Sequence, residues 1–302
     1  MKQKKLEDLT ISNNFMFGAV MSENERCRRF VEMVLGISIA YVEVSKEKSL
    51  IYHPEYKGVR LDVYAKDENN THYDIEMQVA KKPALGKRSR YYHSHLDMEL
   101  LEKSTDYTKL ANAFVIFVCD FDPFGGKKYR YRFRSCCEED RTLLLDDGCE
   151  TIFLSTCGEN ETEVPKELVK FMKFVKADLK ESQQDFDDEL VKIFQEAIQS
   201  IKASREMRGR YMIFEEMMRD ERNEGRQEGI QEGILLGKLE SSREAILDLL
   251  GELGEVPGEL VEMLEAETDL LRLKALHRAA FKSASITEFM EKYEDLRTSE
   301  KK

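Results

Sequence analysis

The stretch that decides the fold is residues 59–79, VRLDVYAKDENNTHYDIEMQV. Its first part alternates apolar with polar residues, which is typical of a strand with one buried face; the apolar set is Val59, Leu61, Val63 and Ala65. The cluster DENN at 67–70 predicts a turn. The second part alternates again, with Tyr73, Ile75, Met77 and Val79 set against His72, Asp74, Glu76 and Gln78. The stretch therefore predicts a β-hairpin.

This hairpin would bring two carboxylates together. A turn centred near Asn69 places Asp62 opposite Glu76, with Gln78 one step further along the same face. Directly opposed residues have β-carbons about 4.5–5.5 Å apart, and like charges held there repel. A cation such as Mg²⁺, which takes carboxylate, carbonyl and water oxygens, would relieve that repulsion. One-sided hairpins also carry polar residues on a face that meets only solvent, and the pattern alone leaves this alternative open.

Other motifs, in order along residues 8–155, carry a resemblance to a known family. They are NNFMF at 13–17, RSRYY at 88–92, YTKLANAFVIFV at 107–118, and LDDG at 145–148 ahead of IFL at 152–154. Together with Asp62 and the run Glu76-Met77-Gln78, they resemble the PD-(D/E)XK nucleases. More narrowly, the chain resembles the bacterial recombination-promoting nuclease or transposase family within that superfamily. The resemblance implies a restriction-endonuclease-like fold and double-stranded DNA as the substrate.

The same resemblance implies a set of site residues. Asp62 and Glu76 would bind Mg²⁺, with Mn²⁺ as an alternative ion. Glu32, on a helix expected over about 22–35, is the candidate for a further acidic metal ligand, although a glutamate there also suits a solvated helix face. Arg88 and Tyr92 stand where the family has an arginine and a tyrosine beside the active site. Their spacing of four places both on one helical face, and Tyr92 also suits a place in the core.

Gln78 departs from the commonest pattern. Most of the superfamily has lysine at this position, whereas the resemblance extends to relatives that have glutamine. An amide cannot act as a general base near neutral pH, but it can hold a water molecule by hydrogen bonds. We therefore expect Gln78 to belong to the catalytic set as a positioning group, with Lys81 or Lys82 reaching back as the alternative.

Two groups of cations are candidates for contacts with nucleic acid. Lys81 and Lys82 follow the hairpin, and a second group alternates with aromatic residues in a predicted strand: Lys128, Arg130, Arg132 and Arg134. Phosphate contacts from such a row supply affinity that does not depend on base sequence. Charged rows also protect exposed sheet edges from pairing, so both roles stay open.

Charge and composition narrow the function classes. The 302 residues carry a net charge of -12. Residues 1–160 hold 24 Lys and Arg against 26 Asp and Glu, and the remainder holds 23 against 33, so the first half is free to carry a basic patch. The six cysteines show no CxxC pairing, which disfavours a structural zinc site. Without an apolar run of about 18 residues, we expect a cytoplasmic protein with no membrane contact.

The apolar runs and the glycines predict how the chain is divided into a sheet domain, a helical arm and a C-terminal unit. Residues 113–119, AFVIFVC, predict a strand buried on both faces, and 151–154 predict the last strand of a mixed sheet. We expect a nuclease-like domain over 1–200, a Glu/Gly-rich helical arm or linker over 201–240, and a small helical unit over 241–302. Glycines at 225, 229, 233 and 237 each cost a helix roughly 0.5–1 kcal/mol relative to alanine. They indicate a pliable arm or a close helix contact.

The sequence thus predicts an α/β protein, with a mixed central sheet flanked by helices and an all-α C-terminal extension. The predicted function is a metal-dependent DNA endonuclease that hydrolyses phosphodiester bonds. The C-terminal helical region is the candidate contact for a homo-oligomer. The alternative is an inactive nuclease fold that serves as a DNA-binding or assembly module. A transposase that joins strands is disfavoured, because the sequence shows neither a separate DDE-type carboxylate triad nor a zinc or helix-turn-helix DNA reader.

Overall fold

The structure is a computed structural model that describes residues 4–45, 49–50, 59–101 and 104–299. The chain divides into two compact units, the first ending at Phe214 and the second beginning at Glu215. A continuous helix, α6 (Arg205–Leu253), crosses this boundary and contains all four glycines of the predicted arm. A β-carbon at any of these four positions would meet no atom within 4 Å in the described part of the chain. The glycines therefore make no close helix contact there.

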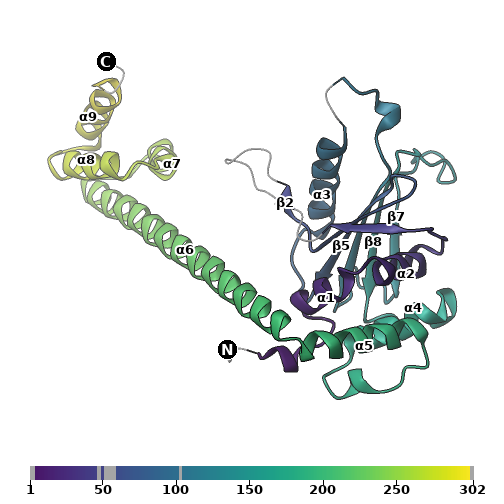
Figure 1. The fold of residues 1–302 in the computed structure, drawn as a ribbon. Coiled ribbons are helices and arrows are strands. Elements are labelled where there is room, and N and C mark those ends of the chain that lie inside the picture. The colour runs from purple at the N-terminus through teal and green to yellow at the C-terminus, as the bar shows by residue number, and fades with distance from the viewer. Residues whose placement is uncertain (1–3, 46–48, 51–58, 102–103, 300–302) are drawn as a thin grey trace. The chain divides into compact units, whose positions relative to one another are not determined.

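A six-stranded mixed sheet forms the centre of the first unit (Figure 1). Its order is β1 (Val42–Ser45), β4 (Val63–Asp67), β5 (His72–Gln78), β6 (Ala113–Cys119), β8 (Cys149–Ser155) and β7 (Arg130–Phe133). The pairs β5–β6 and β6–β8 are parallel and the other pairs are antiparallel. Helix α3 (Leu85–Leu100) lies between β5 and β6 in the chain, as a parallel pair requires a long connection. The short strands β2 (Ser49–Leu50) and β3 (Val59–Arg60) pair separately.

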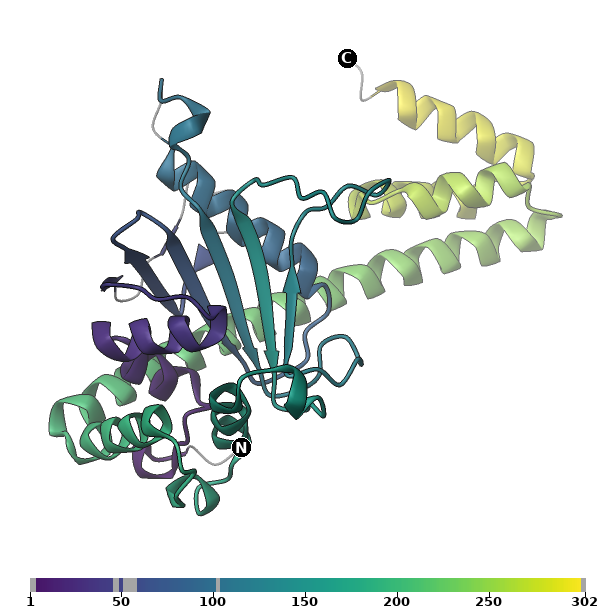
Figure 2. The ribbon, with the colours of Figure 1, turned by 90° about the vertical axis from the view of Figure 1, so that its right-hand side faces the viewer.

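Helices cover both faces of this sheet (Figure 2). The first core lies on one face and takes residues from α1 (Asn14–Met21), α2 (Asn24–Leu35), α4 (Lys166–Lys176) and α5 (Glu189–Ala203). The second core lies on the other face under α3 and contains Leu61, Tyr64, Leu85, Tyr92, Leu96, Ala113, Val115, Phe117, Cys119 and Phe153. Single turns of 3₁₀ helix occur at Leu6–Asp8, Tyr107–Lys109, Glu161–Glu163 and Glu181–Gln183.

Local signals explain where α2 begins and ends. The side chain of Glu23 accepts hydrogen bonds from the backbone N–H groups of Glu25 and Arg26, which satisfies two of the free donors of the first turn. Gly36 then takes a left-handed conformation with φ of 71°, which ends the helix at a residue with no steric penalty. The helix lies within the range 22–35 predicted from the sequence.

The hairpin has the predicted register, but its first strand is interrupted. Val63 lies opposite Ile75 and Ala65 opposite Tyr73, which is the predicted register, although β4 begins only at Val63, one residue after Asp62. The turn is held by Asp67, whose Oδ1 accepts the N–H groups of residues 69 and 71. The expectation for Leu61 was wrong: it packs in the second core, whereas Val63 packs in the first. Alternation fails at residues 61–62 because the chain leaves regular strand geometry between β3 and β4.

The second unit is helical and has its own core. It is built from the end of α6 with α7 (Gly258–Ala266), α8 (Leu270–Phe281) and α9 (Ile286–Ser299). Its buried residues are Leu239, Ile246, Leu250, Leu260, Leu264, Leu273, Leu276, Ala280, Phe289 and Tyr293. Across the described ranges, no helix combines the length and the apolar character needed to cross a bilayer.

Candidate active site

The polar side of β5 is buried beneath α3 rather than exposed. Tyr73, Ile75 and Met77 pack in the first core, so their neighbours Asp74 and Glu76 project from the opposite face of the sheet. Asp74 has an exposure of 0% and Glu76 of 1%, and His72 and Gln78 are buried too. The alternative of a face that only meets solvent was therefore wrong, because α3 covers that face.

Asp62 and Glu76 are joined through the backbone of the two strands. The N–H of Asp62 donates to Oε1 of Glu76 at 3.1 Å, and the N–H of Met77 donates to Oδ2 of Asp62 at 3.1 Å. Each carboxylate thus accepts from the partner strand, which fixes both at the carboxyl end of β5. Helix α1 lies against this point, where Asn14 Nδ2 donates to the Met77 carbonyl at 3.5 Å. Ligand sites in sheets with parallel strands form at such strand ends.

Helix α3 supplies a cation and a phenol to the same place. Arg88 Nη2 donates to Oε2 of Glu76 at 2.7 Å, and the hydroxyl of Tyr92 donates to that oxygen at 3.4 Å. Arg88 Nε also donates to the Tyr92 hydroxyl at 2.8 Å, as the spacing of four residues allows. The guanidinium lies 4.9 Å from the Tyr92 ring centroid, a favourable cation–π distance. The sequence placed both residues on one helical face, and the structure brings that face to Glu76.

Gln78 completes the same network. Its Oε1 accepts from Nη1 of Arg88 at 2.9 Å, and its Nε2 donates to the carbonyl of Met77 at 3.2 Å. Arg88 therefore bridges Glu76 and Gln78 with two different nitrogens. Because the amide is anchored at both ends, Gln78 orients the guanidinium in this structure.

Asp74 is a further carboxyl in this cluster that the sequence reasoning did not select. It is fully buried, and neither of its side-chain oxygens has a hydrogen-bond partner in the part of the chain that the structure describes. Its neighbours across the sheet are Tyr64 of β4 and Val115 of β6. The signal was present, because alternation along β5 places Asp74 on the face of Glu76, one pair before it.

Asp62, Asp74 and Glu76 form a carboxyl cluster. When all three are ionised, they carry more negative charge than Arg88, the cation described beside them, compensates. Burial, followed by repulsion from Asp62, raises the pKa of Glu76 to about 8, although Arg88 acts in the opposite direction. Burial and the charges of Glu76 and Asp62 raise the pKa of Asp74 well above its ordinary value. Burial would lower the pKa of Arg88, but its acidic neighbours, Glu76 first, raise it on balance. Such a cluster favours an additional cation or bound protons.

We expect the metal-free protein to lose stability as the pH rises from about 5 to 8. The pKa of Glu76 is raised from 4.5 to about 8 in the folded state, so between these values the folded state binds more protons than the unfolded state. The stability linked to Glu76 is fully present below its unfolded pKa and is lost as the pH rises through its folded pKa. The slope reaches roughly 1.4 kcal/mol per pH unit for one such group.

Urea denaturation in EDTA at several pH values measures this slope. Glu76→Gln removes the titrating carboxyl and keeps its shape, so the slope should become shallower. A slope that is unchanged in Glu76→Gln would assign the pH dependence to other groups.

The residues present fit a hard divalent cation held by few protein ligands. Mg²⁺ usually takes one or two carboxylates, with waters and substrate phosphates completing its shell. Asp62 and Glu76 offer two carboxylates in one cluster, and the oxygens of Asp74 lack donors among the described residues. In the same described ranges, no set of three or more His, Cys, Asp or Glu side chains is arranged to hold a metal.

Glu32 lies elsewhere. Its Oε1 accepts the N–H of Ile39 at 2.8 Å, and its Oε2 pairs with Arg28 at 2.9 Å. It belongs to α2, which packs on the first core, whereas Glu76 projects toward α3 on the opposite face. The sheet therefore separates Glu32 from the cluster, and position in the sequence alone could not show on which face α2 packs.

The predicted basic strand contacts its own protein at three of four positions. Arg130 Nη1 donates to the carbonyl of Val34 at 2.7 Å, Lys128 pairs with Glu163 at 2.7 Å, and Arg132 pairs with Glu150. Arg134 is exposed just after β7. Lys81 and Lys82 are exposed on the segment between β5 and α3, close in sequence to the cluster.

Comparison with known proteins adds one finding. A family model described as PD-(D/E)XK nuclease family transposase matches residues 5–228. This range contains the whole sheet, the carboxyl cluster and the first part of α6. No curated protein and no solved structure gave a match.

Proposed function

This chain belongs to the PD-(D/E)XK nuclease family transposases, and from that premise we propose that it is a Mg²⁺-dependent endonuclease that hydrolyses phosphodiester bonds in DNA. The observation that carries the proposal is the hydrogen-bonded placement of Asp62 beside the buried Glu76 at the end of β5, next to Arg88. A buried cluster of carboxyls is costly to stability unless a cation compensates it. Such a cluster therefore supports a functional site over a purely structural one.

The residues have distinct roles in this proposal. A bound Mg²⁺ would polarise the scissile phosphate and lower the pKa of a water molecule. Asp62 and Glu76 would hold it, and their backbone hydrogen bonds keep both carboxylates in place. Tyr92 orients Arg88, whose planar guanidinium can bind phosphate oxygens as well as a carboxylate. Mn²⁺ presents a similar preference for oxygen ligands.

Gln78→Ala is expected to lower the rate of DNA cleavage by roughly 10²–10³-fold, the loss typical of one oriented hydrogen-bonding group. The variant removes the acceptor that holds Nη1 of Arg88. Gln78→Lys should also lower the rate, because it places an ammonium beside the guanidinium. Single-turnover cleavage rates measure both. Parental rates in both variants would reduce Gln78 to a packing role.

Exposed cations are the proposed contacts with DNA. Lys81 and Lys82 fit this role, as does Arg134 beyond β7. Lys128, Arg130 and Arg132 are engaged within the protein, so their contribution to DNA affinity would require exchange of those contacts. Each phosphate contact that is removed should lower the dependence of log affinity on log salt by about one unit.

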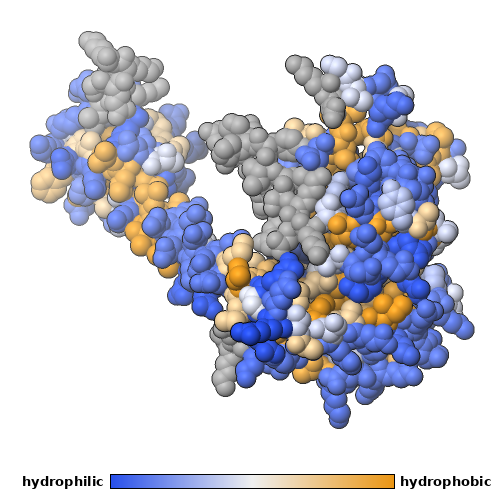
Figure 3. Space-filling model, in the orientation of Figure 1, coloured by the Kyte–Doolittle hydropathy of each residue, from blue (hydrophilic) through white to orange (hydrophobic). Residues whose placement is uncertain are grey.

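Helix α6 supports the proposal of a homo-oligomer through the helical region. The helix carries four glycines at a spacing of four, and the neighbouring Ile230 and Ile234 are 52% and 53% exposed. Hydrophobic side chains interrupt the mostly hydrophilic surface of this helix (Figure 3). The mass of the full chain in solution, compared with that of Ile234→Glu, tests this contact.

Cleavage of supercoiled plasmid tests the function as a whole. With Mg²⁺ the protein should produce nicked or linear DNA, and with EDTA it should not. The second candidate function is that of an inactive nuclease fold that binds DNA. It is favoured because groups of the protein itself already donate hydrogen bonds to both carboxylate oxygens of Glu76. That candidate predicts DNA binding in gel shifts without cleavage under either condition.

A further inference from the structure

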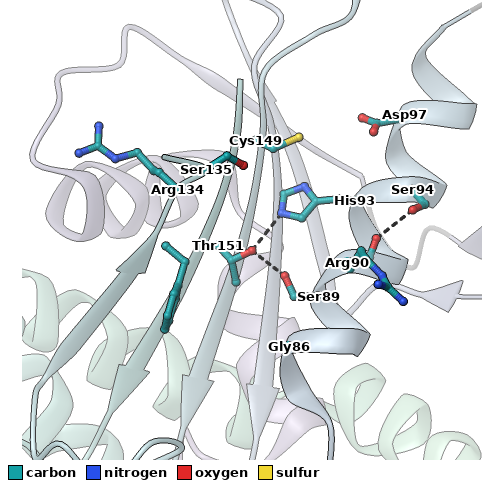
Figure 4. Close-up of a pocket in the computed structure, with 11 residues that line it drawn as sticks. Gly86, Ser89, Arg90, His93, Ser94, Asp97, Arg134, Ser135, Cys149 and Thr151 are labelled. Atoms are coloured by element: carbon teal, nitrogen blue, oxygen red, sulfur yellow. Dashed lines mark hydrogen bonds between the residues drawn. The ribbon is translucent and has the colours of Figure 1, made fainter. Parts of the chain in front are cut away.

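A second polar site lies on the α3 side of the sheet. A pocket of about 460 Å³ opens between α3, the end of β7 and the first residues of β8 (Figure 4). This volume falls in the range of small-molecule sites. The pocket uses none of the carboxyls described above, and its lining includes Ser89, His93, Asp97, Phe133, Arg134 and Thr151.

The floor of this pocket is a connected set of hydrogen-bonding groups. The hydroxyls of Ser89 and Thr151 are 2.6 Å apart, and Nε2 of His93 lies 3.1 Å from the same threonine oxygen. In Figure 4 the side chains of Ser89 and His93, which both belong to α3, point toward Thr151 on β8. These contacts link the helix to the sheet and hold the pocket in shape.

Asp97 provides an acceptor that the described residues leave unmet. Its Oδ1 is buried without a hydrogen-bond partner in the residues that the structure describes. Burial, with the charge of Asp147 as a second cause, raises the pKa of Asp97. A buried carboxylate oxygen without a donor costs free energy, so a ligand with N–H groups would fit it. The same carboxylate disfavours an inorganic anion as the ligand.

The remaining lining adds an aromatic surface and two cations. Phe133 is 46% exposed at the end of the edge strand β7, and an exposed aromatic face can stack on a base. Arg90 and Arg134 line the same pocket from α3 and from the segment after β7. A ligand with N–H donors, a flat ring and a negative charge matches all three features.

We propose that this pocket binds one unpaired nucleotide of the substrate whose base carries an exocyclic amino group. Asp97 accepts from the amino group, Phe133 stacks on the base, and Arg90 and Arg134 contact its phosphates. Cytosine fits, since its N4 amino group donates, whereas thymine presents the acceptor O4 to the same carboxylate. The inference rests on the proposed function in that the substrate is a nucleic acid.

Binding of labelled single strands to the full chain tests this site. Fluorescence anisotropy in EDTA at about pH 8 compares short oligo(dC) with oligo(dT), with roughly 10-fold tighter binding of oligo(dC) expected from one such contact. Asp97→Asn should abolish this preference. Glu99→Gln is the matched control, because it makes the same charge change on the same helix at an exposed residue outside the pocket, and it should retain the preference.

A second variant separates stacking from base recognition. Phe133→Leu should weaken binding of both strands about 10-fold and leave their ratio unchanged. Equal affinity for the two strands in the parent protein would overturn the proposal, and so would a preference that survives in Asp97→Asn. Plasmid cleavage by the parent distinguishes the two failures: cleavage without a preference refutes only the nucleotide site, whereas neither cleavage nor binding refutes the proposed function as well.

Discussion

Asp62→Asn is expected to reduce Mg²⁺-dependent cleavage of plasmid DNA by at least roughly 10²–10³-fold, the range found when one charge-stabilising group leaves an active site. The variant keeps the shape of the side chain and the acceptor for the N–H of Met77, so the hairpin should fold normally. It removes one of the two negative charges that a divalent ion would need. Initial rates of nicking over a range of Mg²⁺ concentrations measure the loss.

The control for this variant is Asp140→Asn, which makes the same chemical change on an exposed segment after β7. It should cleave at the parental rate. Melting in EDTA should show whether Asp62→Asn is folded. If Asp62→Asn cleaves at the parental rate, the metal site lies elsewhere and the role given to the hairpin fails.

Arg88→Gln is expected to destabilise the metal-free protein by about 1.5–3 kcal/mol at a pH near 8, where Glu76 is partly ionised, because it removes a charge-assisted hydrogen bond from a buried carboxylate. Glu76 accepts from Arg88 at 2.7 Å and is 1% exposed, so its charge would lose its nearest described cation. Near pH 5 the loss should be smaller, since the raised pKa of Glu76 allows it to take up a proton. Urea denaturation in EDTA measures the loss of unfolding free energy at each of the two pH values.

Arg29→Gln is the matched control for this change. Arg29 pairs with Glu25 and Glu189, whose side chains are exposed, and such pairs contribute roughly 0–1 kcal/mol. Its effect should therefore be small at both pH values. An equally small effect of Arg88→Gln would show that Glu76 is protonated in the folded protein even at a pH near 8.

The sequence was sufficient for the elements whose patterns are local. Period-two alternation and one turn predicted the register of β4 with β5, because a shift of one residue would have moved every side chain to the opposite face. The apolar run 113–119 matches β6 residue for residue. Spacing alone placed Arg88 and Tyr92 together, since residues four apart in a helix are neighbours.

The rest depended on packing that no local pattern encodes. The burial of Asp74 follows from α3 crossing the sheet, and the separation of Glu32 follows from α2 packing on the opposite face. The partners of Arg130 and Arg132 come from other elements, at Val34 and Glu150. Charge alternation identified these arginines as outward-facing cations but could not show which of them the protein itself engages.

The bond between Arg88 and Glu76 neutralises one carboxylate of the cluster in the absence of metal. A divalent ion at the proposed site would compete with the guanidinium for the same carboxylate oxygen, so metal uptake would be an exchange in which one cation displaces another. The apparent metal affinity would then be lower than the intrinsic affinity by the free energy of the competing ion pair. The arginine freed by this exchange carries its charge at the end of a helix side chain next to the metal, where a phosphate would arrive. Such a site would bind metal weakly by itself and more tightly with DNA, because the substrate accepts the displaced cation.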